Sequence, residues 1–93
     1  MLPLLSITEI ENNITKLPGW QLDGNAIKKE WVFKDFSEAM IFMNNVAEIA
    51  EKNNHHPEIF NVYNRVSIRF YTHDSGGLTE LDFTVAADID HIK

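Results

Sequence analysis

Residues 57–72, PEIFNVYNRVSIRFYT, carry the pattern that decides the fold of this chain. Two runs rich in β-branched and aromatic residues, 57–63 and 66–72, lie on either side of Asn64 and Arg65. In the second run apolar and polar residues alternate, which is the period of a strand with one buried face. The two runs therefore predict a β-hairpin, with its two-residue loop at Asn64 and Arg65.

The segments on both sides of this hairpin complete an α+β pattern. Before it, periodicity and turn residues predict a helix over residues 6–16, strands over 20–23 and 26–34, and a helix over 38–52 capped by Ser37. After it, Thr79 and Asp82 form a capping-box-like pair for a last helix over residues 80–91. The order αββαββα predicts a single domain spanning residues 1–93, a four-stranded antiparallel sheet with helices packed on one face.

The helix predicted over residues 38–52 is apolar around nearly half of its circumference. Phe42 and Ile49 fall on one edge of this apolar arc, and Met40 and Ala47 fall on the other. A helix that covers one face of a sheet needs an apolar stripe of only about 100°. The apolar surface beyond this stripe predicts a symmetric homodimer or homotetramer. It would be formed by this helix or by an edge strand that extends the sheet across subunits.

Composition excludes several classes of protein. With 44% apolar and 24% charged residues, the chain fits a soluble globular protein rather than a disordered one. Its net charge of −6 argues against a nucleic-acid partner, because phosphate binding draws on clustered lysine and arginine. No apolar run approaches the roughly 20 residues of a membrane span, and residues 1–8 lack the marks of a signal peptide. The chain has no cysteine, and we expect a cytoplasmic protein.

Three of the four histidines, His55, His56 and His73, lie close to the predicted hairpin in sequence. With its loop at the predicted position, the hairpin would place His56 opposite His73. All three histidines would then gather at the open end of the hairpin. Because Pro57 restricts His56 to an extended backbone, the side chains of His55 and His56 are expected to point to opposite sides.

A converging set of histidines favours proton-transfer chemistry. Histidine titrates near neutral pH, so two imidazoles can provide one proton donor and one proton acceptor. Such a pair suits a dehydration, in which a leaving hydroxyl gains a proton and a neighbouring N–H loses one. The alternatives are histidines that are simply exposed beside a loop, or a zinc site. We expect no metal, because adjacent histidines diverge and no cysteine can help to bind one.

The spacing of these residues resembles that of the pterin-4a-carbinolamine dehydratase family. The family pattern is an acidic residue, His-His-Pro, an aromatic residue, a later histidine and a final aspartate, represented here by Glu51, His55, His56, Pro57, Tyr63, His73 and Asp82. Residues 51–82 carry the resemblance, and the predicted element order extends it over the whole domain. One departure is Ile59, which stands where many relatives carry tryptophan. It bears on a wall of the pocket or on the packing of that wall, but removes no proton-transfer group.

The resemblance implies a function. It implies a hydro-lyase that converts a 4a-hydroxytetrahydropterin to the quinonoid dihydropterin and water, in tetrahydropterin recycling and without a cofactor. The acid–base pair would be His55 and His73, in an order that the sequence leaves open. The residues implied to contact the pterin substrate are His56, Pro57 and Thr72. The residues implied to support the site are Glu51, as a surface acid or a histidine partner, and Asp82, whose capping would fix the loop that carries His73.

A second hypothesis belongs to a different class of protein. Some relatives of this fold act as dimerisation cofactors of a transcription factor or as assembly factors, and the wide apolar arc of residues 38–52 would suit such a non-catalytic interaction module. The full histidine spacing favours the enzyme, because an interaction module does not need it. The remaining aromatic residues of interest are interpreted as packing residues: Trp20, Trp31, Phe33 and Tyr63.

Overall fold

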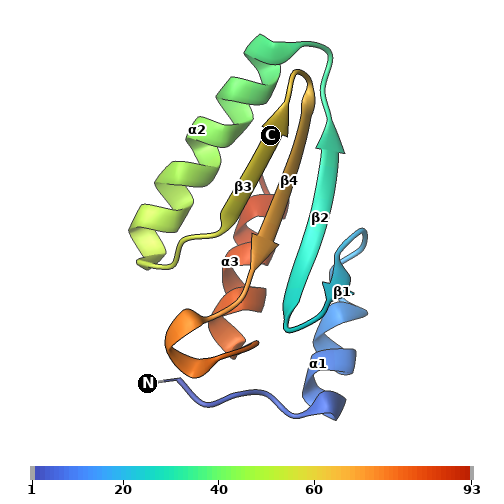
Figure 1. Cartoon of the computed structure of the whole chain (residues 1–93), viewed down its shortest axis with the longest axis vertical. Coiled ribbons are helices and arrows are strands. Elements are labelled where there is room, and N and C mark those ends of the chain that lie inside the picture. Colours follow the sequence, from blue (N-terminus) through green and yellow to red (C-terminus); the bar gives the residue numbers. More distant parts are fainter. Residues whose placement is uncertain (1, 93) are drawn as a thin grey trace.

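The computed structural model describes residues 2–92 of the chain. Its elements follow in the order α1 (Ile7–Ile14), β1 (Gln21–Asp23), β2 (Ala26–Val32), α2 (Phe36–Asn53), β3 (Glu58–Val62), β4 (Arg65–Phe70), the short 3₁₀ helix η1 (His73–Ser75) and α3 (Glu80–Asp90) (Figure 1). The predicted α+β fold with the order αββαββα is confirmed. No helix within residues 2–92 combines the length and the apolar character that crossing a bilayer requires.

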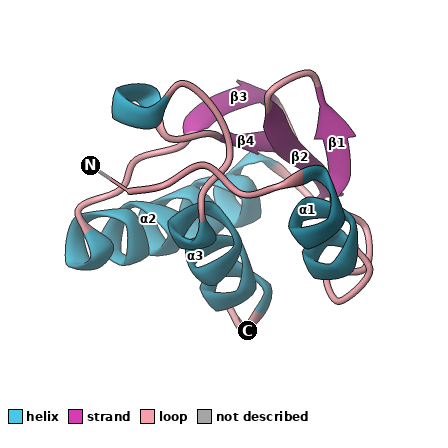
Figure 2. Ribbon diagram, turned by 90° about the horizontal axis from the view of Figure 1, so that it is seen from below, coloured by secondary structure: helices cyan, strands magenta, loops and turns pink. Residues whose placement is uncertain are grey.

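The four strands form one antiparallel sheet in the order β1-β2-β4-β3. Strand β4 pairs with β2 on one side and with β3 on the other, so β1 and β3 are the edge strands. The helices α1, α2 and α3 lie on the same face of this sheet, as predicted (Figure 2). The β3–β4 turn lies at one end of the molecule, beside the start of α2 (Figure 1).

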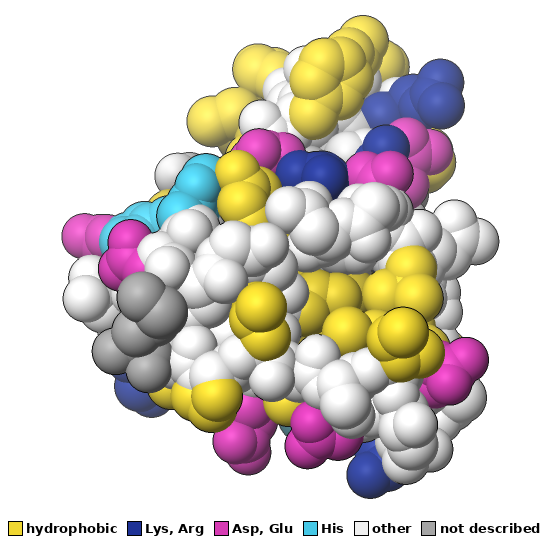
Figure 3. Space-filling model, turned by 60° about the horizontal axis from the view of Figure 1, so that its bottom comes forward, with side chains coloured by type: hydrophobic (Ala, Val, Ile, Leu, Met, Phe, Trp, Pro, Cys, Tyr) yellow, Lys and Arg dark blue, Asp and Glu magenta, His cyan; other side chains and the backbone are white. Residues whose placement is uncertain are grey.

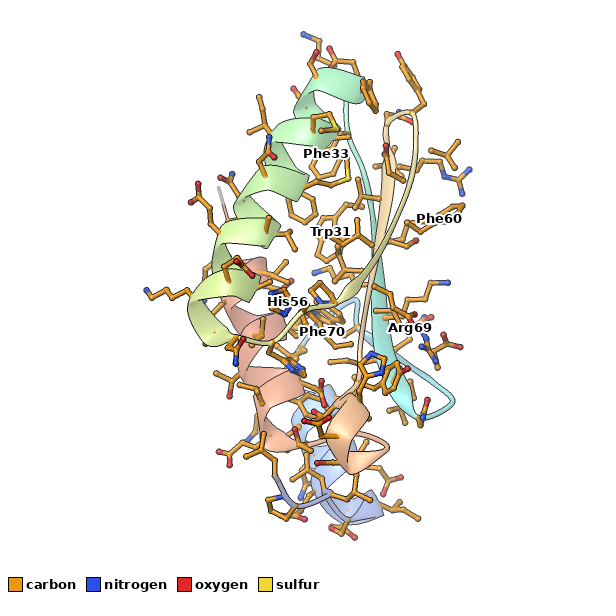
Figure 4. The ribbon with its side chains drawn as sticks, turned by 60° about the vertical axis from the view of Figure 1, so that its left-hand side comes forward. Trp31, Phe33, His56, Phe60, Arg69 and Phe70 are labelled. Carbon is orange, nitrogen blue, oxygen red and sulfur yellow. The ribbon has the colours of Figure 1, made fainter. Side chains whose placement is uncertain are left out.

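The hydrophobic core lies between the sheet and the helices because the strands alternate in sequence. The inward side chains of β4 are completely buried: Val66, Ile68 and Phe70. Burying each such side chain contributes about 1.5–3 kcal/mol to folding. Trp31, Phe33 and Phe70 lie between α2 and the sheet, whereas Phe60 and Arg69 project from the opposite face (Figure 4). The helical residues that complete the core are Ala39, Phe42, Val46, Phe83, Val85, Ala86 and Ile89.

The start of α2 differs from the sequence prediction. Ser37 is predicted as the N-cap, but Asp35 occupies that position, and its Oδ1 accepts a 2.9 Å hydrogen bond from the N–H of Glu38. The Glu38 carboxylate in turn accepts a 3.1 Å bond from the N–H of Lys34. Aspartate and serine are both good N-caps, so the sequence alone does not choose between them. The two bonds that involve Glu38 select Asp35.

The β3–β4 hairpin turns one residue earlier than predicted. Val62 pairs with Arg65, so the loop consists of Tyr63 and Asn64. With this register His56 does not lie opposite His73, and that prediction is wrong.

Contacts on both sides of the turn fix this register. The Asn64 side chain donates to the carbonyl of Phe33 at 2.8 Å, and the Phe33 N–H donates to the Asn64 carbonyl at 2.7 Å. The Asn61 side chain donates to the carbonyls of Tyr63 and Arg65 at 3.1 and 2.9 Å. Tyr63 adopts a φ of 51°, in the left-handed region, which costs about 1–2 kcal/mol in a residue with a Cβ. The hydrogen bonds around the turn offset that cost.

The apolar arc of α2 is used mainly within the chain. Phe42 is buried and packs on the rings of Trp31 and Phe33, with centroid distances of 4.8 and 4.9 Å. Met40 and Ala47, on the other edge of the arc, are exposed. Phe42 therefore completes the core of its own chain, and the edge of the arc that faces solvent is the one that carries Met40 and Ala47.

Candidate active site

A surface cavity of about 370 Å³ lies at the open end of the β3–β4 hairpin. The C-terminal end of α2, the start of β3 and the loop after β4 meet there. The lining residues are Asn54, His55, His56, Pro57, Glu58, Thr72, His73 and Asp74. Histidine side chains gather at one place on the surface, with acidic side chains beside them (Figure 3). The three histidines thus converge as predicted, although the hairpin register differs.

His55 is held by the end of α2 and by the core. Asn54 ends the helix in the left-handed conformation with a φ of 49°, and the N–H of His55 donates to the carbonyl of Ala50 at 3.0 Å. The imidazole stacks on Phe70, with 5.5 Å between ring centroids and 12° between ring planes. Only 8% of His55 is exposed. Its ring is therefore packed like a core side chain.

A buried carboxylate at the start of α3 holds the same ring. Asp82 Oδ1 lies 2.6 Å from His55 Nε2, and Asp82 Oδ2 accepts from the Thr72 hydroxyl and the Thr79 N–H, both at 2.9 Å. The Thr79 bond is part of the predicted capping box, which is present. The hydroxyls of Thr72 and Thr79 lie 2.7 Å apart. This set of partners offsets the cost of burying Asp82, which has no exposed surface.

The contact with Asp82 decides which ring nitrogen of His55 is free. A carboxylate oxygen accepts hydrogen bonds, so the His55 tautomer that satisfies this contact has its N–H on Nε2. No hydrogen bond from residues 2–92 reaches Nδ1, yet every buried side-chain nitrogen and oxygen of these residues has a partner. Nδ1 therefore reaches the surface, and it is the His55 atom available for proton transfer.

His56 points away from the core, as the extended backbone before Pro57 predicts. Its Nε2 pairs with a carboxylate oxygen of Glu51 in the last turn of α2. The two side chains are 56% and 76% exposed, so the pair contributes little to stability. Glu51 is therefore a histidine partner, one of the two roles considered for it. Pro57 lies beside this pair in the cavity wall.

His73 enters the cavity from the loop after β4. Thr72 forms an isolated antiparallel bridge with Gly77, and the Thr72 carbonyl accepts a 2.9 Å bond from the N–H of Gly76. These bonds close a compact loop around His73. The His73 side chain is exposed, and its ring centroid lies 4.2 Å from that of Tyr71, at an interplanar angle of 44°.

Part of the cavity lining was not predicted from the sequence. Asn54, Glu58 and Asp74 line the cavity, and each lies next to a predicted site residue in sequence, which was the available signal. The Tyr71 ring beside His73 was also missed. Its signal was the two-residue spacing from His73, which puts both side chains on one side of an extended chain.

Tyr63, a residue of the family pattern, lies at the opposite end of the hairpin from the histidines. It occupies the turn and is 62% exposed, so it does not line the cavity, and its interpretation as a packing residue is wrong. Trp20 is buried, and Trp31 and Phe33 pack against the core, as predicted.

A larger cavity of about 560 Å³ lies elsewhere, between α2, the end of α3 and β2. Three aromatic side chains contribute to its wall: Trp31, Phe33 and Phe42. Its lysine and aspartate, Lys29 and Asp90, already form an ion pair at 2.9 Å, and no histidine lines it. This cavity is the larger of the two, but the histidine cavity is the one that contains proton-transfer groups. We therefore regard the histidine cavity as the candidate active site.

Within residues 2–92, no group of three or more His, Asp and Glu side chains is arranged to hold a metal ion. The carboxylates of Asp82 and Glu51 each engage one histidine instead. What the arrangement offers chemically is one imidazole fixed in the core, one exposed imidazole on a loop, and a third at the rim.

Comparison with known proteins identifies the family. The family model described as pterin 4 alpha carbinolamine dehydratase matches residues 3–92. A relative from Synechococcus sp. (strain WH7803), provisionally named pterin-4-alpha-carbinolamine dehydratase, is 51% identical over 90 residues, which cover 97% of each chain. The chain thus resembles this relative over nearly its full length.

Two solved structures share the fold. The transcriptional coactivator/pterin dehydratase from Brucella melitensis has a TM-score of 0.89 and 45% identity, over 94% of this chain and 95% of that chain. A pterin dehydratase-like RuBisCO assembly factor of the alpha-carboxysome has a TM-score of 0.62 and 22% identity, over 76% of this chain and 82% of that chain, which shows the fold alone. From the match to the family model and the identity to relatives along nearly the whole length, we conclude that this chain belongs to the pterin 4 alpha carbinolamine dehydratase family.

Proposed function

We propose that this protein is a dehydratase that removes water from a 4a-hydroxytetrahydropterin and releases the quinonoid dihydropterin. The observation that carries the proposal is the convergence of His55, His56 and His73 on one cavity. Membership of the family supports the same activity.

The proposed reaction needs one proton donor and one proton acceptor. The bond between carbon 4a and the hydroxyl oxygen breaks as the oxygen takes up a proton and leaves as water. The neighbouring ring nitrogen loses its proton, and the electron pair of that N–H bond forms the new double bond to carbon 4a. Atoms and charges balance without a redox partner, a metal or an organic cofactor, so two positioned imidazoles suffice.

We assign the two proton transfers to His55 and His73. His55 would act through Nδ1, because Nε2 is engaged by Asp82. His73 would act from the exposed side of the cavity, and either order of acid and base satisfies the balance. His56, paired with Glu51 at the rim, is assigned to substrate binding.

The cavity suits a small heterocyclic substrate. Its volume of about 370 Å³ falls within the roughly 300–1,000 Å³ of small-molecule sites. Pro57 and Thr72 would shape its wall, and the Thr72 hydroxyl is already engaged by Asp82. We propose that residues 1–93 act as one pterin dehydratase-like domain, in the cytoplasm, in the recycling of tetrahydropterin.

The test is a rapid assay with freshly generated 4a-hydroxytetrahydropterin, measured against the spontaneous dehydration rate. His55→Ala and His73→Ala should each lower the enzyme-dependent rate by roughly 10²-fold, the low end for a positioned general acid or base.

His56→Ala should raise KM more than it lowers kcat, as expected when binding is lost uniformly. Exhaustive chelation should leave the native rate unchanged.

The matched control is His91→Ala, which removes an exposed histidine at the C-terminal end of α3 and should keep the native rate. Circular dichroism of each variant checks that it is folded. A near-native rate in the double variant of His55 and His73 would refute the mechanism. Stoichiometric bound zinc, with activity lost on its removal, would refute the metal-free reaction.

A second candidate function is a non-catalytic interaction module. It is favoured by the exposed apolar side chains of β3, where Ile59, Phe60 and Val62 are 43%, 67% and 54% exposed. The relative from Brucella melitensis is named both a coactivator and a dehydratase, so the two functions do not exclude each other. Native protein that fails to accelerate the dehydration would favour the module.

A further inference from the structure

The three histidines of the cavity differ in what holds their rings. His55 is held by Asp82, and His56 is paired with Glu51. The His73 ring makes no side-chain hydrogen bond within the described chain, and its contact is with an aromatic ring, that of Tyr71. The orientation of His73 must therefore be explained by this contact and by its loop.

The contact between Tyr71 and His73 is close. Their centroids are 4.2 Å apart, slightly closer than the roughly 4.5–7 Å that is usual for aromatic pairs. The two residues alternate along the chain with Phe70 and Thr72, which are buried on the helix side. Tyr71 and His73 thus lie on the outer side of the extended segment that follows β4. Tyr71 is not among the residues that line the cavity, and its contact with a lining residue is the one that its ring makes with His73.

The Tyr71 ring is itself held from the sheet. The Arg69 guanidinium lies over it, with 5.4 Å between Cζ and the ring centroid. Arg69 donates to Asp23 at 2.8 Å and to Glu58 at 3.0 Å, which ties it to both edge strands. Both hydrogen bonds raise the pKa of Arg69, and the one with Asp23 has the larger effect. A cation over an aromatic face attracts it, so Arg69 restrains the Tyr71 ring.

We infer that Tyr71 is a positioning residue that sets the orientation of the His73 imidazole toward the cavity. The inference rests on the proposed function and adds a residue to it. An exposed histidine without a partner samples several rotamers, and proton transfer needs the reacting atoms in a near-attack geometry. Contact with the Tyr71 ring reduces the number of rotamers that the His73 side chain can adopt. Arg69 keeps the Tyr71 ring in place.

The test uses variants that separate the ring from the hydroxyl. Tyr71→Leu should lower kcat roughly tenfold with little change in KM, because a misplaced catalytic group costs rate rather than binding. Tyr71→Phe keeps the ring and should restore the native rate. The matched control is Tyr63→Leu, which removes the exposed tyrosine of the hairpin turn and should leave kcat unchanged.

Two further measurements exclude a merely structural role. In a His73→Ala background, Tyr71→Leu should cause no additional loss of kcat. In NMR spectra, Tyr71→Leu should shift the ring-proton resonances of His73, whose ring lies against that of Tyr71, and leave those of His55 in place. Native protein without dehydratase activity would refute the proposed function. Active native protein whose Tyr71→Leu variant keeps kcat, or loses it additively with His73→Ala, would refute this inference alone.

Discussion

At the scale of single residues, Asp82 has two roles: it caps the start of α3, and it holds the imidazole of His55. Its Oδ2 accepts the N–H of Thr79 at the start of α3, and its Oδ1 holds Nε2 of His55. The carboxylate is completely buried, so water cannot replace a partner that is lost. A substitution here should therefore affect both the helix start and the imidazole.

We predict that Asp82→Asn lowers both stability and rate. The amide offers one acceptor oxygen in place of two and adds an N–H₂ donor, so at least one donor among Thr72, Thr79 and His55 loses its acceptor. An unsatisfied buried group costs about 1–3 kcal/mol, to be measured by chemical denaturation. The dehydration rate should fall by roughly tenfold or more, because the tautomer and orientation of His55 are no longer fixed.

The control for this variant is Asp88→Asn, which changes an exposed acid of the same helix and should alter neither quantity. If Asp82→Asn were destabilised but kept the native kcat, Asp82 would serve the fold alone.

At the scale of elements, the loop that carries His73 is fastened by the N-terminal segment. The N–H of Leu5 donates to the carbonyl of Leu78 at 3.0 Å, and the Ser75 hydroxyl donates to the carbonyl of Leu2 at 2.5 Å. This loop therefore depends on residues that are far from it in sequence and outside the cavity.

We predict that removing residues 1–4 speeds amide hydrogen exchange in residues 72–77. The truncation deletes the acceptor for Ser75 and frees the backbone at Leu5, so the loop opens at lower free energy. Exchange measured by mass spectrometry should rise there and stay unchanged in α2. Ser75→Ala, which removes one of the two bonds, should give a smaller rise. Unchanged exchange in the truncated protein would show that the loop is held by its own bonds.

Elements that depend on local sequence signals were predicted more accurately than those that depend on distant contacts. The alternation of β4 and the capping pair at α3 are local signals, and both were predicted correctly. The hairpin turn was misplaced because Asn64 bonds to Phe33, 31 positions away, which no local pattern reveals. The N-cap of α2 was misplaced because two adequate caps lie close together in sequence.

Part of the candidate site was likewise predictable from the sequence, and part was not. The gathering of the histidines at one end of the hairpin was predictable, because His-His-Pro and Thr-His lie at the ends of the two strand patterns. The bond between His55 and Asp82 spans 27 positions, and that between Arg69 and Asp23 spans 46. Such partners depend on how α3 and β1 pack on the sheet, so they needed the structure.

At the scale of the whole molecule, the strand order leaves β3 at an edge of the sheet with exposed apolar residues. An unprotected edge strand can pair with another strand. We predict a homodimer or homotetramer in which β3 pairs antiparallel with β3 of a second copy, since a two-fold axis brings the same edge of both copies together.

The test is Phe60→Lys, which places a charge on a β3 side chain that is 67% exposed and should shift the mass in light scattering to a smaller species. The matched control is Leu22→Lys on the other edge strand, where the side chain is 50% exposed and the mass should not change. A native protein that is monomeric at about 100 µM would contradict this assembly, since a stable complex has a Kd well below that concentration.

The double attachment of Asp82 has a consequence for how this chain can change over generations. Because Asp82 is buried with all its partners, we expect selection for folding alone to act against mutations at Asp82, even where no pterin is ever encountered. The geometry of His55 is then inherited as a by-product of foldability. Under the proposed function, His73, exposed on its loop, has no such protection and is free to change in a lineage that no longer needs the reaction. In a lineage that took on another role in place of the proposed catalysis, we expect His73 to be replaced before His55. His55 and Asp82 would remain because of their place in the fold.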